Sequence, residues 1–547
     1  MKDGYELIRK VSLIKHRRFD IAQVLIRCIP AIFAVVALAV VVCSGNVDFV
    51  RKHDYISRYQ WVFCLAGIAF AAVLVLLTKA IGSNTKICSR FKTPLAFNVV
   101  LVALCILVFV YQLLAIHESW FRTDWDVATL VIPYEQQAED WSDWYFSAYP
   151  NQRFLYCMFE VISNIGLHFG VEDRYLALVI GGSVNIVIAL FCMGVSAKWA
   201  FGYRVGYLAI VFGAFFIGSS PWFYVPYSDS YGILWPILLV FLYQLFEKYR
   251  IHYFIKWFCL TFVTCIGYSI KPTVLFAFAA IVLVELAAVV RAIRGKQCYR
   301  DRKGAIKRTC LHSLKLCMAV VLSVVVSSSA VSFSEKGLRP VDNSCSFSMT
   351  HFLMMGANYD AGGVWNEGDV EFSKSFDNSR DRNSENISEW TSRIEQMGIC
   401  GLSNLALCKT LTNFSDGTFT WAGEGKFWEE IPDKQSFFKK YYGIGSFDSE
   451  KPSSDSGLLF QLLSQISWFS ILSGVSLLIF KKKYGKIETI MLVSLLALVL
   501  FLTIFECRAR YLYLYLPFFV TLGVVGWDNI TYLLSDGRFR KHVIVAK

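Results

Sequence analysis

Charged side chains are scarce in this chain. Only 18% of the 547 residues are Asp, Glu, Lys or Arg, while 55% are hydrophobic, and soluble proteins usually carry about 25% charged residues. Apolar runs of roughly 20 residues recur along the sequence, and each is long enough to cross a hydrocarbon core of about 30 Å as a helix. The sequence therefore excludes a single soluble core and predicts an all-α polytopic membrane protein.

Signals of several other protein classes are missing. No P-loop and no dinucleotide-binding fingerprint occurs, and metal-ligand spacing is absent. The sequence has no internal repeat of the kind that would indicate a transporter built of inverted repeats. The net charge of +12 lies in short basic clusters between apolar runs, where it sets membrane orientation and does not indicate nucleic-acid binding.

Cysteine is common in the chain, but most cysteines lie where they cannot form a disulfide framework. Most of the sixteen cysteines lie inside apolar runs, where they act as packing residues. The segment 334–456 and the outer end of the span 487–506 together contain four, which leaves room for one disulfide. These four are Cys345, Cys400, Cys408 and Cys507.

The apolar runs predict twelve spans, the first of them retained because no convincing cleavage site follows it. The predicted spans are 22–44, 60–79, 95–116, 174–196, 202–219, 231–246, 252–269, 273–291, 314–333, 457–480, 487–506 and 511–533. The connector 291–310 is the most basic, so we expect it in the cytoplasm. By alternation, both termini are then cytoplasmic. This holds if 151–169 is an amphipathic helix at the membrane interface and does not cross.

Two long segments then lie on the outer face of the membrane. The first is the loop 117–173, with interfacial helices, and the second, 334–456, is large enough to form a mixed outer domain. We expect four parts. They are a cytoplasmic N-terminus with two added helices (1–94), a membrane core (95–333), the extracytoplasmic domain (334–456), and the last spans with a basic tail (457–547).

An acidic and aromatic motif follows the third span. Trp-Phe-Arg-Thr-Asp-Trp-Asp places Asp124 and Asp126 beside aromatic rings at the outer membrane surface. A carboxylate there can take a proton from an attacking hydroxyl, and the pair could also hold a divalent cation such as Mg or Mn. The alternative is a solvated loop within an aromatic belt.

A second acidic candidate is Asp229, in Pro-Tyr-Ser-Asp-Ser at the outer start of a span. Its alternative role is to cap that helix. His351 opens the large outer segment, and the alternative for it is a hydrogen-bonded structural histidine.

Three cations lie at outer ends of spans, where the positive-inside rule does not favour them. They are Lys271, Arg508 and Arg510. A phosphate would explain all three, because arginine offers paired donors and lysine a point charge to a phosphoryl group. Otherwise they are snorkelling side chains, with Glu506 as a local partner.

The order of these motifs resembles that of the polytopic GT-C glycosyltransferases that use lipid-phosphate sugars. The resemblance is in particular to bacterial relatives of the protein O-mannosyltransferases and to the aminoarabinose transferases. The resemblance covers roughly residues 95–530. It comprises the acidic motif, the stretch headed by Tyr149-Pro150-Asn151, Asp229, an outer domain with His351, and Glu506 to Tyr511. The Asp-Trp-Asp here departs from the Asp-Glu of the mannosyltransferases.

The resemblance implies transfer of a sugar from a polyprenyl-phosphate carrier to an acceptor outside the cytoplasm, with inversion at the anomeric carbon. It implies a catalytic role for Asp124, Asp126 or Asp229 and a phosphate site at Lys271, Arg508 and Arg510. The substrate-binding residues it indicates are Tyr149, Asn151, Arg153, His351 and Glu506. We expect a bacterial plasma membrane, in which the sequons at Asn386 and Asn413 have no meaning.

Two other functions are compatible with the sequence. One is a transporter or flippase of a lipid-linked glycan, whose ionisable residues should line a path through the bilayer centre. The other is a polysaccharide polymerase or ligase, which would use a diphosphate-linked glycan. The sugar, the acceptor (glycan, lipid or protein), the dependence on a metal and the oligomeric state do not follow from the sequence.

Overall fold

The structure, a computed structural model, is that of an all-α membrane protein. The structure describes residues 21–43, 59–83, 91–123, 125–133, 139–294, 302–421, 435–445 and 457–535. Within these ranges the elements are α-helices and short 3-10 helices, without a β-strand. The predicted cytoplasmic N-terminus before residue 21 lies outside them, as do residues 295–301 of the basic connector.

Among the described residues, eleven segments are long and apolar enough to cross a membrane, which confirms the predicted polytopic helical architecture. Their helices are α2 (Ile21–Cys43), α4 (Gln60–Ser83), α6 (Pro94–Ser119), α10 (Arg174–Phe201), α12 (Ser228–Gly232) with α13 (Leu234–Lys248), α14 (Tyr253–Ile270), α15 (Leu275–Arg294), α16 (Arg302–Ser334), α21 (Leu458–Leu477), α22 (Lys486–Ile504), and α23 (Leu516–Ser535) with the preceding 3-10 helix η11 (Ala509–Tyr515). The one remaining predicted span, 202–219, corresponds to α11 (Tyr203–Phe216), which is shorter.

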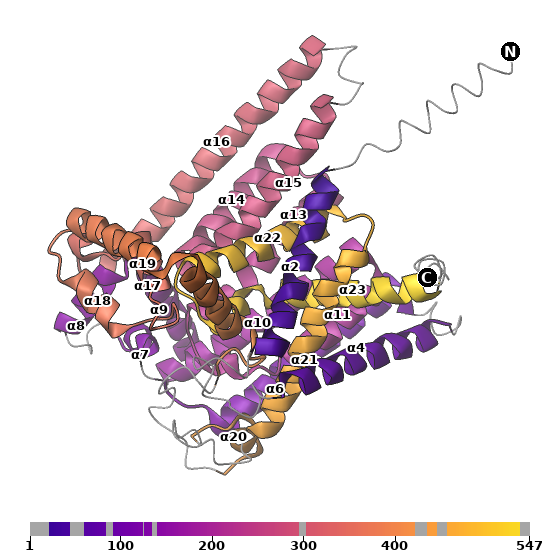
Figure 1. Cartoon of the computed structure of the whole chain (residues 1–547), viewed down its shortest axis with the longest axis horizontal. Coiled ribbons are helices and arrows are strands. Elements are labelled where there is room, and N and C mark those ends of the chain that lie inside the picture. The colour runs from indigo at the N-terminus through magenta and orange to yellow at the C-terminus, as the bar shows by residue number, and fades with distance from the viewer. Residues whose placement is uncertain are drawn as a thin grey trace.

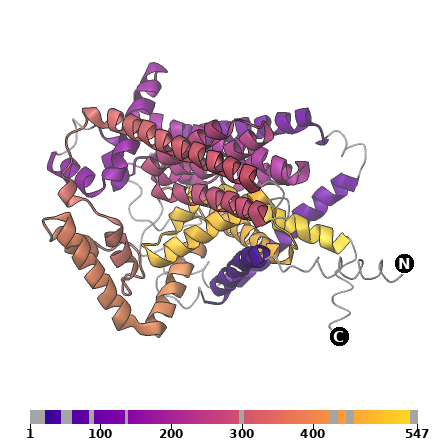
Figure 2. The ribbon, with the colours of Figure 1, turned by 90° about the horizontal axis from the view of Figure 1, so that it is seen from above.

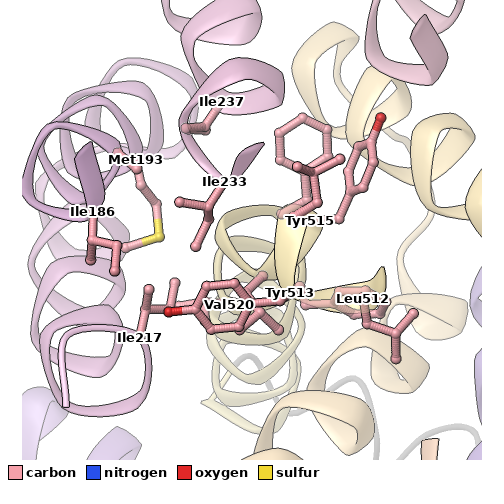
Figure 3. Packing of buried hydrophobic residues seen from close by; sticks show 14 of the residues in the cluster. Ile186, Met193, Ile217, Ile233, Ile237, Leu512, Tyr513, Tyr515 and Val520 are labelled. Carbon is pink, nitrogen blue, oxygen red and sulfur yellow. The ribbon is translucent and has the colours of Figure 1, made fainter. Parts of the chain in front are cut away.

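The core of the bundle is formed by α10, α13, η11 and α23. Figure 3 shows Ile186 and Met193 of α10 facing Ile233 and Tyr513, all of them fully buried. By contrast, α16 packs mainly on α14 and exposes apolar side chains such as Val321 and Val325 along the edge of the bundle (Figure 1). A lipid-facing helix is expected to look like this, because lipid tails are as apolar as the side chains.

Several helix ends meet at one end of the bundle, which we call the site end. Arg122, after α6, pairs with Asp173 before α10, and Lys271, after α14, pairs with Asp229 in α12. Because both α10 and α12 begin at the site end, α11 must return the chain there between them. The short α11 therefore fills the place of a span in the predicted alternation.

The loop between α6 and α10 lies along the site end. It contains α7 (Asp126–Val131), α8 (Glu139–Ala148), the 3-10 helix η4 (Pro150–Gln152) and α9 (Arg153–His168). Cys157 in the middle of α9 donates to Ser334 at the end of α16, and Glu160 pairs with Arg174 at the start of α10. The helix therefore runs along this end, with Phe169 just beyond it 80% exposed, as expected for an interfacial helix.

We call residues 334–456 the outer segment, after their predicted position. It is built from helices and loops beside α7, α8 and α9 (Figures 1 and 2). Its described helices are α17 (Met349–Gly356), α18 (Glu367–Lys374), α19 (Ser379–Phe414, kinked at Gly398) and α20 (Phe437–Tyr442). Three buried indole N–H groups fix it to the bundle or to itself. Trp468 donates to the carbonyl of Phe414 at 2.8 Å, Trp222 to that of Thr418 at 3.1 Å, and Trp421 to that of Tyr442 at 3.0 Å. The segment is therefore docked firmly on the spans.

Candidate functional site

Lys271 lies at a corner where the chain turns between two spans. Pro272 cannot donate a backbone hydrogen bond, so it ends α14 and opens the 3-10 helix η6 (Pro272–Val274) before α15. Lys271 itself is extended, and its N–H caps α14 by donating to Gly267 at 2.8 Å. Its ammonium points toward α12 and donates to Asp229 at 2.6 Å and to Ser228 at 3.3 Å.

Asp229 is the buried anion at the centre of the site. Its side chain is 0% exposed, and its second oxygen lies 3.4 Å from Nε of Arg510. The N-cap residue of α12 is Tyr227, whose backbone N–H donates to the hydroxyl of Ser230. Asp229 therefore does not cap the helix. It joins two cations that lie more than two hundred residues apart in the sequence.

Arg510 lies among three aromatic rings. Its guanidinium carbon lies 4.3 Å from the ring centroid of Trp125, 5.4 Å from that of Tyr227 and 5.8 Å from that of Tyr511. Trp125 has φ of +59°, a backbone conformation that costs energy for a residue with a side chain. Strain of this kind persists where the surrounding packing imposes it, which here is at the acidic motif.

Tyr227 connects the two acidic motifs. Its hydroxyl donates to Oδ2 of Asp126 at 2.8 Å and accepts from Nε2 of Gln152 at 3.3 Å, while its ring lies beneath both Arg510 and Lys271. Asp126 is in the first turn of α7 and is only partly buried. The structure thus brings Asp126 into the same cluster as Asp229, Lys271 and Arg510. Asp124 lies outside the described residues.

Glu506 and Arg508 form the next part of the cluster. Nε of Arg508 lies 3.1 Å from Oε1 of Glu506, and the hydroxyl of Tyr511 donates to Oε2 at 3.3 Å. Burial raises the pKa of Tyr149, with further increases from the charges of Asp126 and Glu506, while Arg508 opposes them. The charges of both the acidic motif and the Glu506–Arg508 pair therefore act on Tyr149.

Tyr145 is a site residue that the sequence analysis missed. Burial raises its pKa well above the usual value, Asp126 and Tyr149 add to the shift, and Arg510 opposes it. Its buried hydroxyl has no hydrogen-bond partner among the described residues. Tyr145 belongs to the aromatic run Trp141–Phe146, and nothing in that run singles it out. Tyr227, by contrast, is in the Pro-Tyr-Ser-Asp motif.

Three predicted substrate-binding residues lie elsewhere. Arg153 pairs with Glu335 at 3.4 Å and donates to the carbonyl of Arg339 at 3.0 Å, which fixes α9 to the end of α16. His351 is 0% exposed and bonds Ser373 at 2.7 Å inside the outer segment. Asn151 is exposed at the start of η4. Among the described residues, no hydrogen bond or ion pair joins any of these three to the cluster.

The described part of the cluster is balanced in charge. Three cations (Lys271, Arg508, Arg510) face three acids (Asp126, Asp229, Glu506). In the parts of the chain that the structure describes, no group of three or more His, Cys, Asp or Glu side chains could hold a metal ion. The pair expected to bind a divalent cation includes Asp124, so that expectation stays a prediction. The four outer cysteines are free thiols.

Fold and cluster together define a polytopic integral membrane protein with an ion-paired, aromatic-lined site at one end of its helices. The chain belongs to the family described as conserved hypothetical integral membrane protein, whose model matches residues 18–531. No curated protein and no solved structure matches the chain.

Proposed function

We propose that the protein is a membrane glycosyltransferase that moves a sugar from a polyprenyl-phosphate carrier to an acceptor hydroxyl. In this proposal the site end faces away from the cytoplasm of a bacterial cell. One observation carries the proposal. Acids and cations from four separate parts of the chain meet at a single end of the helices. The ends of membrane-spanning helices lie at the depth of the lipid headgroups, where the phosphate of a lipid-linked sugar is found.

Asp126 is the proposed base. The oxygen of the acceptor hydroxyl attacks the anomeric carbon, the bond from that carbon to the phosphate oxygen breaks, and its electron pair leaves with the phosphate. The hydroxyl proton passes to the Asp126 carboxylate and then to solvent. A single displacement inverts the anomeric carbon. Asp126 suits this role because it is partly accessible, and Tyr227 fixes its orientation at 2.8 Å.

The cations are the proposed binding site for the phosphate, which gains one negative charge as the sugar leaves. The side chains of Arg508 and Lys271 are 21% and 13% exposed, so both have surface for a ligand. Arg510 is 6% exposed and stacks on Trp125. Fixed cations in a water-poor site stabilise developing charge more than they would in water. A donor already activated by phosphate supplies the driving force.

Asp229 has a different proposed role from the catalytic one that the resemblance implies. It has no surface for a hydroxyl to approach, because it is fully buried and each of its oxygens faces a cation. We assign it to holding Lys271 and Arg510 in place and not to proton removal. A divalent cation at Asp124 and Asp126 stays part of the proposal as a further way to stabilise the phosphate.

A transporter or flippase is the main alternative, and a second ion-pair cluster bears on it. Lys256 pairs with Glu247 at 2.5 Å and with Glu285 at 3.5 Å, and Lys486 pairs with Glu285 at 2.7 Å. This cluster lies at the other end of α13, α14 and α22. Between Lys256 and Lys271, α14 carries no charged side chain. A polar path through the bilayer centre, which a flippase needs, is not formed there, so an enzyme at one end is favoured.

The test is transfer by the purified protein. Wild-type protein in lipid nanodiscs is supplied with a panel of polyprenyl-phosphate and polyprenyl-diphosphate sugars, with glycan, lipid or peptide acceptors, and with or without a chelator. Inverted transfer from a monophosphate donor is expected. Arg510→Ala should weaken donor binding more than acceptor binding. Transfer only from diphosphate donors would support a polymerase or ligase. Movement of donor across proteoliposomes without transfer would support a flippase, and either result would overturn the proposal.

A further inference from the structure

Lys409 is a buried lysine where three segments meet. It lies in the second half of α19, is 1% exposed, and donates to the carbonyl of Gly356 at 2.8 Å and to that of Phe505 at 2.7 Å. No carboxylate lies within ion-pair distance of its ammonium among the described residues. A buried ammonium is costly unless it is hydrogen-bonded, so this arrangement persists only if both carbonyls stay in place.

The carbonyl of Phe505 begins a stretch that the outer segment holds residue by residue. The N–H of Glu506 donates to the carbonyl of Phe352 at 3.0 Å, and the N–H of Cys507 donates to that of Gly363 at 3.0 Å. Phe505, Glu506 and Cys507 are thus each bonded to α17, α19 or the loop after α17. The next residue is Arg508, the most exposed cation of the charged cluster.

Two glycines allow this close approach. A Cβ atom on Gly356 would lie 2.5 Å from the carbonyl carbon of Phe505, which is a clash with backbone. A Cβ atom on Gly363 would lie 2.9 Å from Cδ of Lys409, and Gly363 also has φ of +74°. A side chain at Gly356 would therefore push the outer segment away from the stretch before Arg508, and one at Gly363 would displace the side chain of Lys409.

We propose that Lys409 is a positioning residue that couples the outer helices α17 and α19 to the charged cluster. By fixing the Phe505 carbonyl it sets the direction in which Glu506 and Arg508 enter the site. The outer segment is then part of the wall of the phosphate site and not a separate lid. A ligand that shifts α19 would change the affinity for phosphate. The identity of the ligand as a phosphate rests on the proposed function, whereas the coupling itself rests only on the contacts.

Two variants disturb the coupling from opposite sides. Lys409→Met removes both hydrogen bonds at similar volume, and Gly363→Ala leaves the lysine but displaces it. Both should speed amide hydrogen exchange at Glu506 and Cys507 without changing exchange in α10 or α23. Both should raise the dissociation constant for a short-chain polyprenyl phosphate roughly 10- to 100-fold, because small misplacements in a charged site have effects of that size. The KM for acceptor should change much less.

Three further variants make the test decisive. Lys409→Arg keeps the charge and the donors and should return binding to within about threefold of wild type. Lys336→Met and Gly337→Ala, in an exposed turn of the same segment where a Cβ meets nothing, should behave as wild type. Unchanged exchange at Glu506 and Cys507 in both Lys409→Met and Gly363→Ala would overturn the inference. Faster exchange in a protein that transfers no sugar would retain the coupling and remove the proposed function.

Discussion

The hydroxyl of Tyr227 donates to the carboxylate of Asp126 at 2.8 Å across 101 residues of sequence. This bond joins the loop after α6 to the start of α12, so it links the proposed base to the cations around Asp229. It also leaves Asp126 partly accessible, whereas Asp229 is fully buried. The two carboxylates, which look alike in the sequence, therefore have different environments and different expected roles.

Asp126→Asn should reduce sugar transfer by roughly 10²- to 10⁴-fold, the usual range for loss of a general base. Donor binding should be nearly unchanged, because the cations remain in place. The rate is measured with saturating donor and acceptor. Asp143→Asn is the matched control, because Asp143 lies in the same loop but pairs with Arg339 at 3.2 Å. Full activity of Asp126→Asn would remove the residue from the mechanism.

Glu506→Gln should tighten the binding of polyprenyl phosphate about three- to tenfold at low salt, because it removes a negative partner of Arg508. The gain should shrink as salt is added. Dissociation constants at two ionic strengths measure this, with Glu335→Gln, whose partner is Arg153, as the control. Weaker binding in Glu506→Gln would instead show that Glu506 holds Arg508 in its working position.

Asp229→Ala should destabilise the protein by about 3 kcal/mol, because it leaves two cations without their shared buried partner. Thermal unfolding of the detergent-solubilised protein measures the change. Adding Lys271→Met should recover part of the loss by removing one of the unpaired charges. If the double variant is less stable than Asp229→Ala alone, the two residues do not act as an ion pair.

The outer segment should lose stability as the pH falls from about 6.5 to about 4. Burial lowers the pKa of His351 to about 4. Its Nδ1 bonds Ser373, whose hydroxyl donates to Asn386, and its buried Nε2 has no partner among the described residues. Below pH 6.5 the unfolded chain binds a proton that the folded chain does not, so stability falls by about 1.4 kcal/mol per pH unit across this window.

Limited proteolysis of the outer segment at several pH values measures this effect. His351→Gln removes the titrating group and should flatten the dependence. Substitution of His168, which is exposed at the end of α9 and not part of the outer segment, should leave the pH dependence unchanged. Equal pH dependence in His351→Gln and wild type would show that another group titrates.

Hydropathy predicted eleven of the twelve spans correctly, because a span is a local property: about 20 consecutive apolar residues are needed whatever surrounds them. The same argument placed Lys271 and Asp229 at span ends, since charges inside a bilayer are costly. The boundaries followed local chemistry, as at Pro272, where a missing N–H ends α14. For the predicted span 202–219 the structure has the apolar helix α11, which is shorter than the helices counted as spans.

Only the tertiary structure decided which of these polar residues meet. The spacing of Asp229 from Arg510 in the sequence says nothing of their contact, because that depends on how α12 packs against η11. Tyr145 entered the cluster, and Arg153 and His351 lay outside it, for the same reason: side-chain partners across hundreds of residues are set by helix packing. The sequence by itself determined the membrane environment and the placement of charge at the helix ends. The packing of those ends determined the site.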